Sequence, residues 1–269
     1  MSQTLSGRRA LAAVSLGIAA VGVQAASVQV KVSVESLVPA HGISFAPVHV
    51  GFGNGSFDAF NLGGVATAPI ISVAEGGSAS AWFPAFAAAE AGATLGTVAM
   101  APLQPGGLFM NSFMVDSAVN RYFTFASMVV PSNDHFVGND DPMEYELFGA
   151  GAALQITSIT VKASEIWDAG SEAFDPAHAA FVMGGNNDLR TPQGSVVAFN
   201  FGELAAFNGM STATSYVLNS QLRADTDVLR FNFAVQAVPE PETYALMLGG
   251  LAALGFMARR RRAWGRRRW

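Results

Sequence analysis

Acidic side chains are concentrated in one stretch of the chain, between Asp134 and Asp175. This stretch holds nine Asp and Glu residues and a single basic residue, Lys162. Carboxylates at such density repel one another unless they are solvated or neutralised by a cation. Calcium suits this composition, because it takes about six to eight oxygen ligands from carboxylates, carbonyls and water in a flexible cage. The stretch therefore indicates either a metal site or a solvated acidic loop.

Two segments of this region join a hydrophobic run to a polar turn. The first, residues 123–138, reads FTFASMVVPSNDHFVG, and the second, residues 165–172, reads EIWDAGSE. Gly138 and Gly170 allow tight turns that bring backbone carbonyls close to the carboxylates. Asp140 and Asp141 could add a ligand, but their spacing alone does not assign them one.

These two segments resemble the spondin domain of extracellular-matrix proteins and its bacterial relatives, over roughly residues 27–185. In that family the matching segments read as a strand ending in Pro-Ser-x-Asp, followed by Trp-Asp-Ala-Gly-Thr-Asp. The resemblance implies a β-sandwich related to membrane-binding calcium modules, with a bound calcium ion. Carried over by position, the ligands are Asp134, Asp168 and Glu172. Glu172 stands where the family usually has Asp, and it offers two oxygens on a longer arm.

Motifs for catalysis are missing from the sequence. The four His residues show neither His-x-x-x-His nor His-Glu-x-x-His spacing, which argues against a zinc site. There is no Gly-x-Ser-x-Gly elbow and no glycine-rich phosphate loop ahead of a helix. We therefore expect a protein that is not an enzyme. The alternative is a secreted hydrolase of matrix polysaccharide or protein, with Asp134 and Asp168 as acid and base.

The composition excludes several classes of protein. The chain has 269 residues, of which 51% are hydrophobic and 13% charged, and it has no Cys. Disulfide scaffolds and thiolate metal sites are therefore excluded, and a disordered chain is not expected. Residues 27–238 carry six basic and eighteen acidic side chains, a net charge of −12. Nucleic acid is not expected as a partner, because phosphate binding needs a basic surface.

The body of the chain, residues 27–238, is expected to be rich in β-strands. Hydrophobic and polar residues alternate over 28–35 and over 228–235, and other β-rich runs cover 48–52, 122–130, 155–162, 195–201 and 215–218. Turn-rich segments separate these runs, and only Ala85–Ala93 has a helical pattern. The expected fold is all-β, an antiparallel β-sandwich. The matching patterns at its two ends suggest that the first and last strands lie close together.

Residues 1–26 are typical of a signal peptide. Arg8 and Arg9 precede a run of fourteen residues, Ala10–Val23, that is apolar apart from Ser15. Small residues then offer a signal-peptidase site just after Ala25 or Ala26.

Residues 239–269 combine a Pro-Glu-Pro motif, an apolar run and an Arg cluster. Pro239, Glu240 and Pro241 hold the chain extended, since proline fixes φ and disfavours helix at the preceding residue. The fifteen residues 244–258 span roughly 22 Å as a helix, which is short of a bilayer core of about 30 Å. The arginines after them keep the tail on the cytoplasmic side. Transient membrane insertion is therefore expected.

This tail resembles the PEP-CTERM sorting signal of exported proteins in Gram-negative bacteria. The resemblance implies an exosortase, a membrane-embedded cysteine transpeptidase or protease, as a partner, and a host that makes extracellular polysaccharide. Together the resemblances imply an exported protein of the cell envelope or extracellular matrix. Such a protein would be adhesive or structural in a polysaccharide matrix or biofilm, with exopolysaccharide or surface proteins as further partners.

Processing at both ends is the first testable consequence. Mass spectrometry of the exported protein should find a chain that starts near Ala26 or Ser27 and lacks residues 244–269. Replacing both Pro239 and Pro241 with Ala should leave unprocessed protein in the inner membrane. Recovery of an intact C-terminal Arg cluster on the cell surface would contradict the sorting-signal interpretation.

Overall fold

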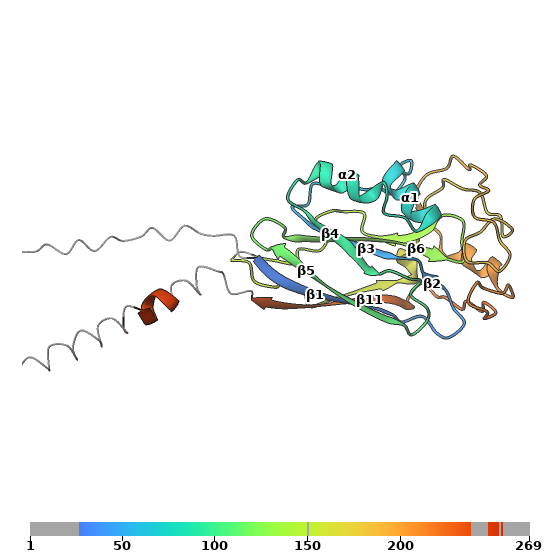
Figure 1. The fold of residues 1–269 in the computed structure, drawn as a ribbon. Coiled ribbons are helices and arrows are strands. Elements are labelled where there is room, and N and C mark those ends of the chain that lie inside the picture. Colours follow the sequence, from blue (N-terminus) through green and yellow to red (C-terminus); the bar gives the residue numbers. More distant parts are fainter. Residues whose placement is uncertain (1–26, 150, 238–246, 253, 255–269) are drawn as a thin grey trace, which may run out of the picture.

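Two antiparallel β-sheets pack face to face in the computed structural model of the chain (Figure 1). The structure describes residues 27–149, 151–237, 247–252 and 254. The expected signal peptide lies outside the described residues, as does most of the expected apolar helix over 244–258. The antiparallel β-sandwich predicted from the sequence is confirmed.

The smaller sheet has four strands in the order β5-β1-β11-β8. β1 (Ser27–Ser36) lies between β5 (Leu108–Asp116) and β11 (Asp227–Ala237), and β8 (Ser158–Lys162) forms the other edge. Strand β1 buries every second residue, so its valines line the core while the polar residues between them face outward. The first and last strands of the described body therefore pair directly, with Val28 opposite Ala237, as predicted.

The larger sheet has seven strands, six of them in the order β10-β9-β7-β6-β3-β4. These six strands are β10 (Ala198–Phe199), β9 (Trp167–Asp168), β7 (His135–Gly138), β6 (Tyr122–Val130), β3 (Val48–Gly53) and β4 (Thr94–Ala99). The seventh, β2 (Ser44–Phe45), pairs with β6. Residues 123–130 of β6 are all buried, because one face of the strand meets the other sheet and the opposite face lies under helices.

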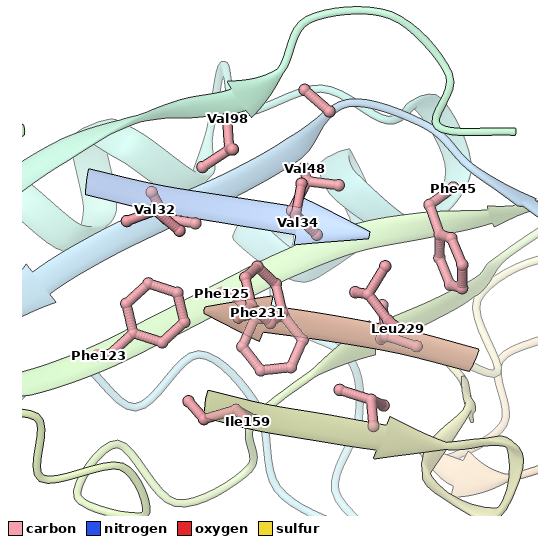
Figure 2. Close-up of a cluster of buried hydrophobic side chains, with 14 of the residues drawn as sticks. Val32, Val34, Phe45, Val48, Val98, Phe123, Phe125, Ile159, Leu229 and Phe231 are labelled. Carbon is pink, nitrogen blue, oxygen red and sulfur yellow. The ribbon is translucent and has the colours of Figure 1, made fainter. Parts of the chain in front are cut away.

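Aromatic and branched side chains fill the space between the two sheets (Figure 2). Phe231 of β11 lies between two rings of β6, with ring centroids 5.4 Å from Phe123 and 4.7 Å from Phe125. Such tilted and edge-on arrangements are the favoured geometry for aromatic pairs. These ring contacts hold β11 of the smaller sheet against β6, a central strand of the larger sheet.

Two short helices cover the outer face of the larger sheet (Figure 1). Helix α1 (Ala68–Gly76) begins after Thr67, whose hydroxyl caps the Ile70 amide, and it ends at Gly77 in the left-handed conformation. Helix α2 (Trp82–Ala89) overlaps the helical pattern predicted over Ala85–Ala93. Helix α1 was not predicted, although Thr67 followed by a proline in the first turn is a recognisable start signal.

Some strand predictions need correction. β4 and β5 were not predicted, and β7 lies inside a segment that was interpreted as a turn. The expected strand over 215–218 forms only an isolated bridge, Ser211 with Val217, because no neighbouring strand is available to it among the described residues. In the run 195–201 only Ala198 and Phe199 are in a strand.

Glu90 ties the end of α2 to the loop after β3. Its side chain is buried, with the residue 3% exposed, and it accepts hydrogen bonds from the backbone amides of Asn54, Ser56 and Phe57. A carboxylate that receives several amides in this way makes charge-assisted hydrogen bonds, which are stronger than neutral ones.

Replacing Glu90 with Gln should lower the free energy of unfolding by about 2–4 kcal/mol, because an amide cannot accept from all three donors. Urea denaturation of the two proteins measures the difference. Glu35→Gln is the control, since Glu35 is half-exposed and its contact with Arg230 is 4.0 Å long, so its loss should change stability by less than about 1 kcal/mol. Equal stability of the Glu90→Gln variant and wild type would show that these hydrogen bonds are not needed.

Candidate metal centre

Three very short strands bring the candidate ligands to one end of the larger sheet. His135 in β7 pairs with Asp168 in β9, and Asp168 pairs with Ala198 in β10. Residues paired across strands lie on the same face of a sheet, so the His135 and Asp168 side chains are neighbours. The 3-10 helix η2 (Phe201–Phe207) follows β10 at once and places Glu203 beside them.

Asp134 precedes β7 and is only 2% exposed. Its Oδ2 accepts hydrogen bonds from the backbone amides of Ser171, at 2.8 Å, and Glu172, at 2.9 Å. The hydroxyl of Ser171 adds a longer contact of 3.3 Å to the same oxygen. Asp134 therefore holds the loop that follows β9 against the start of β7.

Glu172, which is also 2% exposed, turns its side chain toward Asn133. The Asn133 amide donates to Glu172 Oε1 over 3.1 Å, whereas the buried Oε2 has no hydrogen-bond partner. The structure thus joins Glu172 to Asp134 through its backbone amide rather than through its carboxylate.

Asp168 lies at the centre of a second set of contacts. Its Oδ1 accepts from the Gly170 amide at 2.7 Å, and its Oδ2 accepts from the Asn200 side-chain amide at 2.9 Å. The same Asn200 nitrogen lies 3.2 Å from Glu203 Oε2, so Asn200 bridges two carboxylates.

The residues described by the structure contain one group of three potential metal ligands within 4.8 Å of one another: His135, Asp168 and Glu203. His135 is 1% exposed, and its Nε2 lies 2.8 Å from the backbone carbonyl of Asn200. Because a carbonyl only accepts, Nε2 carries the proton, which leaves the buried Nδ1 of a neutral ring without a partner. An unpartnered buried nitrogen is a potential metal ligand.

Of the three ligands carried over from the spondin resemblance, the structure therefore places only Asp168 in this group. Asp134 and Glu172 lie next to it in the fold, through the backbone contacts described above. His135 and Glu203 were missed, because a single His without a spaced partner and a Glu 35 residues beyond Asp168 give no local motif. Asp140 and Asp141 line a different pocket, together with Trp167.

Burial of these carboxylates disfavours their charged forms. Burial raises the pKa of Asp134, and the nearby negative charge of Asp168 raises it further, while the Glu172 and Ser171 amides and His135 oppose the shift. Burial also raises the pKa of Glu172 to about 7, with smaller contributions from Glu75 and Asp134. Hydrogen bonding by Asn133 and the charge of Arg190 act in the opposite direction. A cation at this end of the sheet would favour the charged carboxylates.

The donor set suits a divalent cation. Oxygen from Asp168 and Glu203 meets the preference of calcium, and nearby carboxylates and carbonyls could complete its shell. The imidazole of His135 is a ligand that zinc and other transition metals prefer. The residues therefore fit a metal ion, and the balance between oxygen and nitrogen donors decides which one.

Comparison with protein families identifies the C-terminal segment. Residues 237–262 match the PEP-CTERM protein-sorting motif. This motif marks an exported protein that passes through the inner membrane toward the cell surface and is processed by an exosortase. The search of curated proteins finds no match. Within the part of the chain that the structure describes, no helix has the length and hydrophobicity to cross a membrane.

The raised pKa of Glu172 predicts a pH-dependent stability in the metal-free protein. The folded state holds this proton up to about pH 7, whereas the unfolded chain releases it near 4.5. Between these values the folded state binds more protons, so the free energy of unfolding should fall as the pH rises and then level off. Glu172→Gln, which is neutral throughout, should lose this part of the slope.

Urea unfolding in chelator at pH 5 and pH 8 tests this, with the exposed Asp188→Asn as the control. The wild type and the control should both lose stability between the two pH values, and Glu172→Gln should lose less. An identical change in all three proteins would show that Glu172 does not titrate in this range.

Proposed function

We propose that this protein is a non-enzymatic component of the cell envelope or extracellular matrix whose sandwich is stabilised by calcium. The observation that supports a cation is the group where β7 begins and β9 ends, in which His135, Asp168 and Glu203 converge within 4.8 Å. The buried carboxylate of Asp134 lies close enough to interact with the charge of Asp168 in this group. The spondin resemblance adds calcium as the ion and Asp134, Asp168 and Glu172 as ligands.

The proposed place of action is the surface or matrix of a Gram-negative bacterium. The sorting motif provides export and exosortase processing. An adhesive or structural role, with exopolysaccharide or surface proteins as partners, agrees with a β-sandwich whose sequence carries none of the catalytic motifs considered above. The acidic body disfavours polyanionic nucleic acid as a partner.

A hydrolase is the less favoured function. An acid–base pair must flank a substrate bond in an accessible cleft. Asp134 and Asp168 are 2% and 8% exposed, and their carboxylates already accept hydrogen bonds from backbone amides. These contacts favour a structural role for the pair.

Calcium should raise the melting temperature of the exported protein. A ligand at a hundredfold excess over Kd stabilises the folded state by roughly 2.7 kcal/mol, which corresponds to about 5–10 °C for a domain of this size. Asp168→Asn should remove most of this response, because Asp168 belongs to both the spondin-derived and the geometric ligand sets. Asp225→Asn should not, since its side chain is 82% exposed.

Melting curves in chelator, calcium, magnesium and zinc separate the alternatives. Magnesium should act more weakly, because it demands a tighter octahedral shell. Stabilisation by zinc but not by calcium would contradict the choice of metal and support coordination by His135. Identical melting in all four conditions, with no ion found by elemental analysis, would contradict the metal site itself.

A further inference from the structure

Asp175 and Pro176 form an Asp-Pro peptide bond in the loop that follows β9. The carboxylate of an aspartate can attack the carbonyl carbon of its own residue, because the new bond closes a five-membered cyclic anhydride, and Asp is among the residues that act as covalent nucleophiles. Both groups belong to one residue, so the attack needs no encounter between separate reactants. The Asp175 side chain is 37% exposed, which leaves it open to water.

The carbonyl oxygen of Asp175 already accepts two hydrogen bonds. The His178 backbone amide donates over 3.0 Å, and the side-chain amide of Asn133 donates over 3.2 Å. Asn133 is 2% exposed, and its Oδ1 accepts the Asp175 amide at 3.0 Å, so this donor is held in place. An attack on the carbonyl carbon makes this oxygen an oxyanion, and each donor fixed in such a position contributes roughly 10²–10³-fold to a rate.

The His178 ring places a proton beside the attacking group. Its Nδ1 lies 2.8 Å from Asp175 Oδ2, and because a carboxylate only accepts, Nδ1 carries a proton. The Pro176 nitrogen has no N–H, so breaking the bond releases a secondary amine that must take up a proton. Histidine is the side chain best suited to supply one near neutral pH.

A second Asp-Pro bond in the same chain shows what His178 adds. The Asp141 carbonyl also accepts two hydrogen bonds, from the Glu144 amide at 3.1 Å and from the Asn139 side-chain amide at 3.0 Å. The residue in the position of His178 is Glu144, which cannot carry a positive charge. The two turns therefore share the donors to the carbonyl and differ in the proton donor.

We propose that the protein cleaves its own Asp175–Pro176 bond. A carboxylate oxygen of Asp175 bonds to the Asp175 carbonyl carbon, and His178 protonates the Pro176 nitrogen as the carbon–nitrogen bond breaks. Water then opens the cyclic anhydride, one of its protons returns to His178, and the new amine terminus takes up the other. The sum is hydrolysis of one peptide bond.

This activity goes beyond the proposed function, and it is a single reaction of the chain on itself rather than turnover of a substrate. The part of the chain after the cut supplies β11, which pairs with β1 and β8 from the part before it. The two fragments should therefore stay together in the folded protein and separate only on denaturation.

Denaturing electrophoresis and mass spectrometry of the exported protein, kept folded at neutral pH for several days, test the proposal. The wild type should give one fragment that ends at Asp175 and one that begins at Pro176, and added hydroxylamine should trap the anhydride as a hydroxamate on Asp175. Asp175→Ala should abolish scission, and His178→Gln should slow it by at least about a hundredfold, since a general acid contributes roughly 10²–10⁴-fold.

Two controls separate this reaction from general lability of Asp-Pro bonds. The Asp141–Pro142 bond should stay intact in the same samples, and wild-type protein unfolded in urea at the same pH should lose scission, because only the fold assembles Asn133 and His178 around the bond. Circular dichroism checks that each variant is folded, and the wild-type samples alone decide the outcome for a variant that is not.

An intact Asp175–Pro176 bond in the folded wild type would overturn the proposal. Equal scission at the two Asp-Pro bonds, or scission that continues unchanged in urea, would also overturn it. A folded His178→Gln variant that cleaves at the wild-type rate would remove the assigned proton donor and contradict the mechanism.

Discussion

The Asp134 carboxylate holds one end of the sandwich together. It accepts the amides of Ser171 and Glu172 and so fixes the loop after β9 against the start of β7. β9 and β10 contain only two residues each, so few backbone hydrogen bonds join them to their neighbours. The loop after β9 and the Asn200 side chain add hydrogen bonds that hold this edge of the sheet together. The cost of this arrangement is the burial of negative charge next to Asp168, which raises the pKa of Asp134. A bound cation would offset that cost, and its position would be set by the same contacts.

The pairing of β1 with β11 connects the fold to export. Val28 lies opposite Ala237, so the described body begins and ends at neighbouring positions in the same sheet (Figure 1). The sorting motif starts at residue 237, directly at the end of β11. Since β11 lies between β1 and β8, the smaller sheet cannot be completed without the strand that directly precedes this motif.

The sequence predicted the architecture better than it predicted the site. Many short β-rich runs with turn-rich connections were sufficient to predict an antiparallel sandwich. The alternation at the two ends of the body predicted that the first and last strands lie close together, because a one-sided core imposes a period of two. β5 was not predicted, because the exposed methionines at 110 and 114 on its outer face remove the alternation of hydrophobic and polar residues. The cluster of His135, Asp168 and Glu203 depends on the register of strands of two to four residues. Strands that short have no readable periodicity, so only Asp168, which lies in a recognisable motif, could be predicted.

The most direct test of the account is a crystal structure of the exported protein grown with calcium, with the ion located by its anomalous scattering. A peak is expected where β7 begins and β9 ends, about 2.3–2.6 Å from a carboxylate oxygen of Asp168. Asp134 would still accept the Ser171 and Glu172 amides in that structure. A structure with calcium in the crystal but no ion at Asp168, and with Asn200 still bridging Asp168 and Glu203, would contradict the account.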